Sequence, residues 1–178
     1  DLYSHLVPAE PMSARWLHEI RESWGRKDHP SLKLFPDIRR SKQTIPSLKP
    51  GVSVAVEVFT PPGASTGAIV YLHGGGWIAP MAGKHLGWAR RMAALTGRTV
   101  YAVHYRLAPE HPFPGGLEDC IAVLEEVFNR HHQHDVCIAG DSAGANLAAA
   151  ADQWQRIQQR RRPDRRLLIC GVLDLQLE

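Results

Sequence analysis

The hydrophobic positions of this chain follow a period of two near the start and gather into short continuous runs later. Valine occupies every second position from Val52 to Val58, which predicts a half-buried strand over 52–59. The later runs are bounded by turn residues and predict strands buried on both faces, as in a parallel sheet. These runs cover 68–72, 99–104, 136–139 and 167–173.

Segments with helical spacing of apolar residues separate these runs. They predict helices over 85–95, 117–130 and 143–159, and an earlier helix over 13–24 that Ser13 can cap. Because strands then alternate with helices, the pattern predicts βαβ units and a three-layer α/β sandwich with a mostly parallel sheet. Residues 1–45, which are rich in proline and charge, are expected to form a helical segment ahead of it.

Composition narrows the class of protein. A chain of 178 residues with 44% hydrophobic residues accommodates one soluble domain. The net charge of +3 owes much to an arginine-rich run over 156–166. No aromatic residue interleaves this run, so we expect a solvated loop and no nucleic-acid partner. No apolar stretch reaches membrane-spanning length, and no signal peptide is visible.

Cysteine and histidine usage adds no metal site. The three cysteines, Cys120, Cys137 and Cys170, each lie in an apolar segment, which predicts buried thiols and favours a cytoplasmic location. A histidine cluster over 131–134 matches no ligand spacing and is expected at the surface. We therefore expect neither a metal nor a cofactor.

Two glycine-rich motifs carry the chemistry. Residues 140–144 read Gly-Asp-Ser-Ala-Gly, the G-x-S-x-G pattern that raises a serine hydroxyl on a strand-to-helix turn, so Ser142 is the predicted nucleophile. Residues 73–77 read His-Gly-Gly-Gly-Trp, whose backbone amides can bind an oxyanion. The expected donors are the amide of Ala143 and those of Gly74 and Gly75. The glycine triplet lacks the spacing of nucleotide-binding loops, which argues against a phosphate site.

A third segment, Tyr-Arg-Leu-Ala-Pro-Glu-His-Pro-Phe-Pro over 105–114, lies between these two motifs. In this order and spacing the three segments resemble the hormone-sensitive-lipase-like family of α/β-hydrolases. The resemblance implies hydrolysis of a small-molecule carboxylic ester without a cofactor. It also implies a helical cap over 1–45 and a hydrolase core over 46–178.

The resemblance assigns supporting roles to four further residues. His73 is expected to shape the glycine loop and not to act as a base. Arg106 and Glu110 are expected to hold loops near the site, and Asp141 to support it from the position before Ser142.

The chain departs from the family pattern in two places. His104 stands where members usually carry aspartate, so a carboxylate network there must be rewired if His104 is buried. No histidine follows Ser142, although in this fold the acid and then the base follow the nucleophile. The later aspartates, Asp152, Asp164 and Asp174, do not match the triad acid. The upstream histidines, His73, His104 and His111, come without an evident orienting carboxylate.

We therefore expect the N-terminal portion of a hydrolase core, without the triad acid and base and inactive alone. Its strand over 167–173 would expose an apolar edge that invites self-association. Two other functions stay open: a non-catalytic member that binds a small ligand in the same pocket, and an amidase or deacetylase on the same scaffold.

Overall fold

The structure, a computed structural model, describes residues 13–26, 28–65, 67–131 and 135–173. Its helices are α1 (Ala14–Trp24), the 3-10 helix η1 (Pro30–Lys33), α2 (Gly83–Thr96), α3 (Gly115–Arg130) and α4 (Ala143–Ile157). Its strands are β1 (Arg39–Pro46), β2 (Ser53–Thr60), β3 (Ala68–Leu72), β4 (Thr99–His104), β5 (Val136–Asp141) and β6 (Arg165–Ile169).

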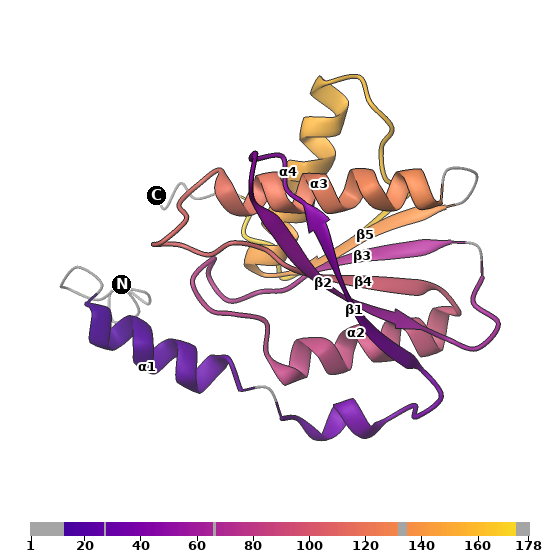
Figure 1. The fold of residues 1–178 in the computed structure, drawn as a ribbon, viewed down its shortest axis with the longest axis horizontal. Helices are drawn as coiled ribbons and strands as arrows, with labels where there is room; N and C mark the ends of the chain where they lie inside the picture. Colours follow the sequence, from indigo (N-terminus) through magenta and orange to yellow (C-terminus); the bar gives the residue numbers. More distant parts are fainter. Residues whose placement is uncertain (1–12, 27, 66, 132–134, 174–178) are drawn as a thin grey trace.

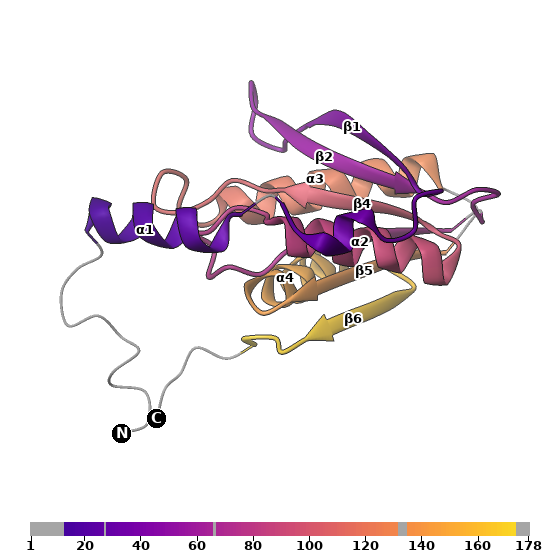
Figure 2. The same ribbon diagram turned by 90° about the horizontal axis from the view of Figure 1, so that it is seen from below.

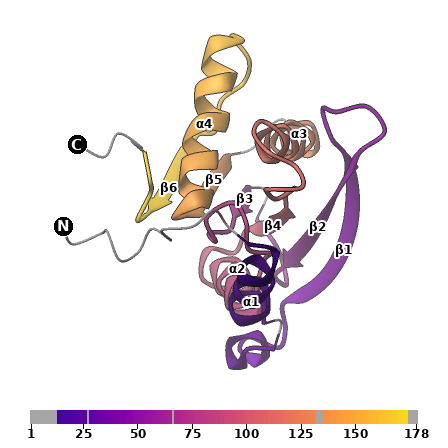
Figure 3. The ribbon, with the colours of Figure 1, turned by 90° about the vertical axis from the view of Figure 1, so that its left-hand side faces the viewer.

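The six strands form one sheet in the order β1-β2-β4-β3-β5-β6. The pairs β3–β4, β3–β5 and β5–β6 are parallel, whereas β1–β2 and β2–β4 are antiparallel. Each parallel connection runs through a helix, which packs α2 on one face of the sheet and α3 with α4 on the other (Figures 1 and 3). The predicted three-layer α/β sandwich with a mostly parallel sheet is confirmed.

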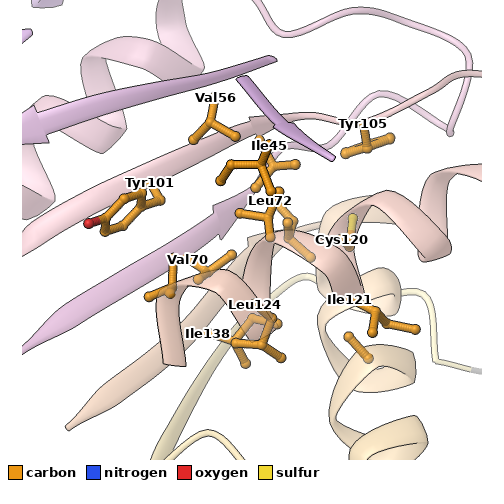
Figure 4. Packing of buried hydrophobic residues seen from close by; sticks show 14 of the residues in the cluster. Ile45, Val56, Val70, Leu72, Tyr101, Tyr105, Cys120, Ile121, Leu124 and Ile138 are labelled. Atoms are coloured by element: carbon orange, nitrogen blue, oxygen red, sulfur yellow. The ribbon is translucent and has the colours of Figure 1, made fainter. Parts of the chain in front are cut away.

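Alternate residues of β3 belong to two separate hydrophobic clusters. Val70 and Leu72 pack with Leu124 of α3 beneath that helix (Figure 4), while Tyr71 faces the cluster under α2 that contains Leu86. All five residues of β3 are buried. The continuous apolar run is therefore explained by a strand that is covered on both faces.

The helix α1 begins where the sequence predicted. The hydroxyl of Ser13 accepts a hydrogen bond from the backbone N–H of Trp16 at 3.1 Å, which satisfies one of the unpaired amides of the first turn. None of its residues is buried. It lies on the side of the molecule where the parallel strands end (Figures 1 and 2).

Two expectations about strands need correction. Residues 39–46 form the strand β1, although most of them lie in the segment expected to be helical. This edge strand is held by its pairing with β2. Ile45 is its one buried residue, so the sequence shows little hydrophobic alternation there. Strand β6 is exposed along most of its length instead of buried on both faces, since in the described part of the chain it pairs only with β5. Figure 2 shows β1 and β6 at opposite edges of the sheet.

The cysteines also differ from expectation. Cys120 is buried, Cys137 is partly buried and Cys170 is exposed, so the prediction of a buried thiol is wrong for Cys170. Asp174 and the histidines at 132 and 134 lie outside the described residues.

Candidate active site

The two glycine-rich motifs meet because their strands are neighbours. In the parallel register of β3 and β5, Leu72 lies opposite Gly140. The loops that follow these positions therefore leave the sheet side by side at the carboxyl ends of the parallel strands, where ligands bind in open α/β sheets. The glycine turn (residues 73–79) and the serine turn (residues 140–144) are in contact there.

Ser142 has a backbone conformation that few L-residues adopt. Its φ is 51° and its ψ is −118°, at the position that precedes the first turn of α4. Its N–H donates to the carbonyl of Ile169 at 2.8 Å, and its side chain makes no helix-capping hydrogen bond. The hydroxyl is therefore not used to satisfy the start of the helix.

Glycines on both sides of Ser142 permit this turn. A Cβ on Gly140 would lie 2.3 Å from the carbonyl oxygen of Gly144, and one on Gly144 would lie 2.1 Å from that of Leu72. The start of α4 is thus packed directly against the ends of β3 and β5. Ala143, the first residue of α4, is buried.

The glycine turn reverses the chain through left-handed positions. Gly76 and Trp77 have φ values of 60° and 61°, and the N–H groups of Ile78 and Ala79 donate to the Gly75 carbonyl at 3.1 and 2.9 Å. Gly74 packs against the serine turn, since a Cβ there would lie 2.5 Å from Oδ2 of Asp141. The turn is therefore fixed both internally and against the residue before Ser142.

Ser142, Gly74 and Gly75 share one cavity of about 240 Å³. Its other lining residues are Trp24, Ala79, Pro80, Lys84, His85 and Asp141. A second cavity of about 250 Å³ lies beside it and shares Lys84, His85 and Asp141. The predicted nucleophile and two of the three predicted oxyanion donors are thus brought together around a space that a small molecule can enter, whereas buried Ala143 is not among the lining residues.

His73 supports the glycine turn from inside the protein. Its Nδ1–H donates to the Gly74 carbonyl at 2.7 Å, and its ring stacks on Tyr105 with centroids 4.3 Å apart. The Tyr105 hydroxyl in turn donates to the His73 carbonyl at 2.6 Å. Complete burial lowers the pKa of His73 to about 3, so the ring is neutral at physiological pH.

His85 lines the cavity, although the sequence pattern did not single it out. Its Nδ1 accepts from the backbone N–H of Ala82 at 3.0 Å, so the proton sits on Nε2, which lies 3.9 Å from Oδ2 of Asp141. Burial lowers the pKa of His85. Neither nitrogen then offers a lone pair to Ser142. The sequence offers one signal for His85. It lies in the first turn of the helix that follows β3, and such a turn faces the carboxyl ends of the parallel strands, where ligands bind.

Asp141 joins the cavity to the sheet. Its Oδ1 accepts a hydrogen bond from the Tyr71 hydroxyl at 2.7 Å, while Oδ2 lies against Gly74. Burial, followed by the neighbouring carboxylate of Asp141, raises the pKa of Tyr71 well above its usual value. Tyr71 therefore stays a hydrogen-bond donor to Asp141.

Arg106 and Glu110 lie outside the cavity and make long-range contacts. Arg106 binds the buried carboxylate of Asp119 through its backbone N–H and Nε, and its Nη2 donates to the Gly115 carbonyl at 3.0 Å. Glu110 pairs with Arg21 of α1 at 2.6 and 2.7 Å, and this pairing lowers the pKa of Glu110 to about 2. The contacts of Arg106 anchor the loop over 105–114 to α3, and the pair between Glu110 and Arg21 connects the same loop to α1.

His104 has a carboxylate partner, Glu57, that the sequence did not reveal. Its Nε2 lies 3.2 Å from Oε1 of Glu57, whose other oxygen bonds Arg40. Burial alone would raise the pKa of Glu57, but His104 and Arg40 outweigh it and lower the pKa to about 2. The expectation that His104 has no orienting carboxylate is wrong. Glu57 thus connects β1, β2 and β4 through Arg40 and partly buried His104, and His104 is absent from the lining of the cavity beside Ser142.

The two later aspartates within the described residues make local contacts. Asp152 pairs with Arg162 and Arg166, and Asp164 accepts from the Val136 amide at 2.8 Å, so neither aspartate lines the cavity. Residues 13–26, 28–65, 67–131 and 135–173 contain no group of three or more potential metal ligands. No helix among them combines the length and apolarity needed to cross a bilayer.

Comparison with known proteins places these features in context. Residues 69–178 match the family model described as the alpha/beta hydrolase fold. The carboxylesterase NlhH of Mycobacterium tuberculosis (strain H37Rv) is 34% identical over 131 residues, which cover 70% of this chain and 41% of that protein. Versiconal hemiacetal acetate esterase of Emericella nidulans is 34% identical over 96 residues, covering 53% of this chain and 34% of the relative.

Solved structures of esterases share the fold. The Pyrobaculum calidifontis esterase in its monoclinic form aligns with a TM-score of 0.77 and 30% identity over 97% of this chain and 56% of that one. A fungal esterase from Rhizomucor miehei aligns with a TM-score of 0.78 and 26% identity, covering 96% and 55%. The chain thus spans less than half the length of these curated relatives and just over half of the solved structures.

Proposed function

This chain belongs to the hormone-sensitive-lipase-like α/β-hydrolases, and we propose that it carries the nucleophile and oxyanion donors of a serine carboxylic-ester hydrolase. One observation supports this most directly. Ser142, whose hydroxyl makes no capping bond, shares a cavity with Gly74 and Gly75. A carbonyl group in that cavity would have a nucleophile on one side and backbone amides on the other.

In the proposed reaction the oxygen of Ser142 attacks the carbonyl carbon of an ester. The developing oxyanion is stabilised by the amides of Ala143, Gly74 and Gly75. Collapse of the tetrahedral intermediate releases the alcohol and leaves an acyl-serine, which water then hydrolyses. Each step needs a base that takes a proton from the attacking oxygen and returns it to the leaving group.

His85 is the one histidine that lines the described cavity, and it is not placed to act as this base. His85 accepts a hydrogen bond at Nδ1 and so carries its proton on Nε2, and no histidine follows Ser142 in the sequence. We therefore propose that these 178 residues alone hydrolyse esters at a negligible rate. Added imidazole should restore part of the activity, because it can enter the cavity and take the missing role.

The test measures hydrolysis of p-nitrophenyl acetate by the chain with and without imidazole. Imidazole cleaves this ester by itself, so the informative quantity is the excess rate over the same mixture containing Ser142→Ala. We expect an excess for the wild type and for the control Ser53→Ala, an exposed serine on β2. Equal rates for wild type and Ser142→Ala, both folded by circular dichroism, would falsify the proposal.

A second candidate function is binding of a small ligand without catalysis, and the lack of a free lone pair on His85 favours it. It predicts that a short-chain ester binds the wild type in calorimetry while imidazole restores no Ser142-dependent turnover. An amidase or deacetylase would use the same donors, and the esterase names of the relatives favour the ester. Parallel assays with p-nitroacetanilide separate the two.

Two further expectations are part of the proposal. The free cysteines support a cytoplasmic location, where thiols stay reduced. The edge strand β6 carries Leu167 and Ile169 with 51% and 38% exposure, which supports self-association of the chain through this edge. Light scattering over a range of protein concentrations tests the association.

A further inference from the structure

Arg21 of α1 makes contacts that reach across the molecule to two loops. Its Nε donates to the Ile78 carbonyl at 2.8 Å, and its Nη1 and Nη2 donate to the two carboxylate oxygens of Glu110 at 2.6 and 2.7 Å. Nη2 also donates to the Ala108 carbonyl at 3.0 Å. The guanidinium group thus binds the glycine turn with one edge and the loop over 105–114 with the others.

Together with a backbone hydrogen bond between the two loops, these contacts connect the glycine turn to the loop over 105–114 in two ways. Ile78 belongs to the turn in which the Ile78 and Ala79 amides bond the Gly75 carbonyl. The next residue back, Trp77, accepts from the Ala108 amide at 2.9 Å through its carbonyl. Arg21 therefore joins Ile78 to Ala108 from outside, while Trp77 and Ala108 are joined directly. A displacement of the guanidinium would release one support of the turn that carries Gly75.

The same helix contributes a wall of the cavity. Trp24 lines the space shared by Gly74, Gly75 and Ser142 and lies three residues after Arg21, on the same helix face. No residue of α1 is fully buried, and its apolar residues Trp16, Leu17 and Ile20 are only partly covered, so polar contacts contribute to holding this helix in place. The helix is attached next to the cavity through Arg21 and through Arg26, whose carbonyl accepts from the Gly83 amide at 2.7 Å.

We propose that Arg21 is a positioning residue: it docks α1 on the glycine turn, which orients the Gly75 amide toward the cavity and holds Trp24 as the wall that an apolar acyl or alcohol group of the substrate contacts. The part concerning Gly75 and the substrate rests on the proposed function. The docking of the turn by Arg21 does not depend on it.

The geometry separates this contact from an ordinary surface ion pair. Exposed ion pairs contribute little to stability. Arg21 instead binds a carboxylate through two parallel hydrogen bonds and two backbone carbonyls through the same planar group. Lysine cannot reproduce this arrangement because its ammonium lacks the planar fork.

The first experiment is amide hydrogen exchange, followed by mass spectrometry, on a peptide that spans residues 75–79. We expect Arg21→Gln to accelerate exchange of the Ile78 and Ala79 amides about tenfold or more, the effect of losing a hydrogen bond to a charged group. Arg15→Gln is the matched control, since Arg15 lies on the same helix and its ion pair within the described residues is with exposed Glu19. Equal exchange of this peptide in the two variants would overturn the proposal.

The second experiment uses the imidazole-restored hydrolysis described above. Arg21→Gln should lower kcat by about tenfold or more and change KM less, because a misplaced amide weakens transition-state binding. Arg21→Lys should recover only part of this loss. An unchanged kcat alongside accelerated exchange would overturn the role at Gly75. If Ser142-dependent turnover is absent altogether, the proposed function fails and the exchange result alone decides the docking role.

Discussion

The carboxylate of Asp141 lies against the α-carbon of Gly74. A Cβ at that position would come within 2.5 Å of Oδ2 and 2.9 Å of the backbone oxygen of Asp141. The two predicted motifs are thus in direct contact, and the absence of a side chain at Gly74 permits it. The hydrogen bond from Tyr71 holds the same carboxylate in place.

Gly74→Ala should therefore push the two turns apart. We expect it to abolish the Ser142-dependent rate while the secondary structure measured by circular dichroism is retained, because the clash with Asp141 is confined to the two turns. Gly115→Ala is the control, since a Cβ there meets its nearest atom at an ordinary 3.5 Å. If Gly74→Ala and Gly115→Ala retain equal activity, the contact between the turns has no bearing on the site.

The second prediction concerns the anchor of the loop over 105–114. Asp119 is 1% exposed and accepts hydrogen bonds from Arg106 and from the Ser47 hydroxyl at 2.5 Å. Asp119→Ala leaves the guanidinium of Arg106 partly buried without its main partner, which should lower the free energy of unfolding by about 3 kcal/mol. Urea denaturation measures this.

Glu118 provides the comparison for Asp119. It also binds Arg106, but its side chain is 32% exposed. Glu118→Ala should therefore cost less than about 1 kcal/mol in the same experiment. Similar losses for Asp119→Ala and Glu118→Ala would show that burial does not govern the strength of this contact.

The sequence predicted most of the sheet for a physical reason. Residues 68–72 form an uninterrupted apolar run because β3 is covered on both faces. Such a run can be recognised in the sequence without knowing which strands or helices pack against it. The contact between the glycine and serine turns was also foreseeable, since neighbouring parallel strands end at the same edge.

The missed features depend on partners that are distant in sequence. Of the residues in β1, only Ile45 is buried, so this strand exists through its ladder with β2 and leaves little periodicity to detect. The pairing of His104 with Glu57 follows from the register of β2 on β4, which hydrophobic patterns do not specify. Arg21 likewise reaches a turn 57 positions away.

The third prediction concerns acid stability and the ion network around Glu57. The folded-state pKa of Glu57 is about 2, below its ordinary value of 4.5, so the ionised form is favoured by folding. The resulting stabilisation is fully present above pH 4.5 and is lost as the pH falls toward 2. It amounts to roughly 3 kcal/mol at neutral pH.

Glu57→Gln removes this dependence without removing the side-chain volume. The difference in unfolding free energy between wild type and variant should be large near neutral pH and shrink toward zero near pH 2. Glu19→Gln, which affects an exposed ion pair with Arg15, should give a small difference at every pH. A wild-type advantage over Glu57→Gln that stays constant with pH would contradict the assigned pKa.

The last prediction isolates the backbone strain at the serine turn. A non-glycine residue at the φ of 51° and ψ of −118° adopted by Ser142 costs about 1–3 kcal/mol. Glycine adopts such a conformation without that cost, although its unfolded chain is more flexible by about 0.5–1 kcal/mol. Ser142→Gly should therefore unfold at a higher urea concentration than Ser142→Ala, by about 1 kcal/mol in free energy.

The opposite order is expected at an ordinary strand position. Ser53 is exposed in β2 and is not among the residues with positive φ. Ser53→Gly should accordingly be less stable than Ser53→Ala by about 0.5–1 kcal/mol. The sign of the glycine–alanine difference thus distinguishes a strained turn from a relaxed strand, and both pairs of variants are free of the side-chain hydroxyl. If glycine is the less stable substitution at both positions, the hydroxyl of Ser142 is not held on a strained turn, and the conformation assigned to residue 142 is wrong.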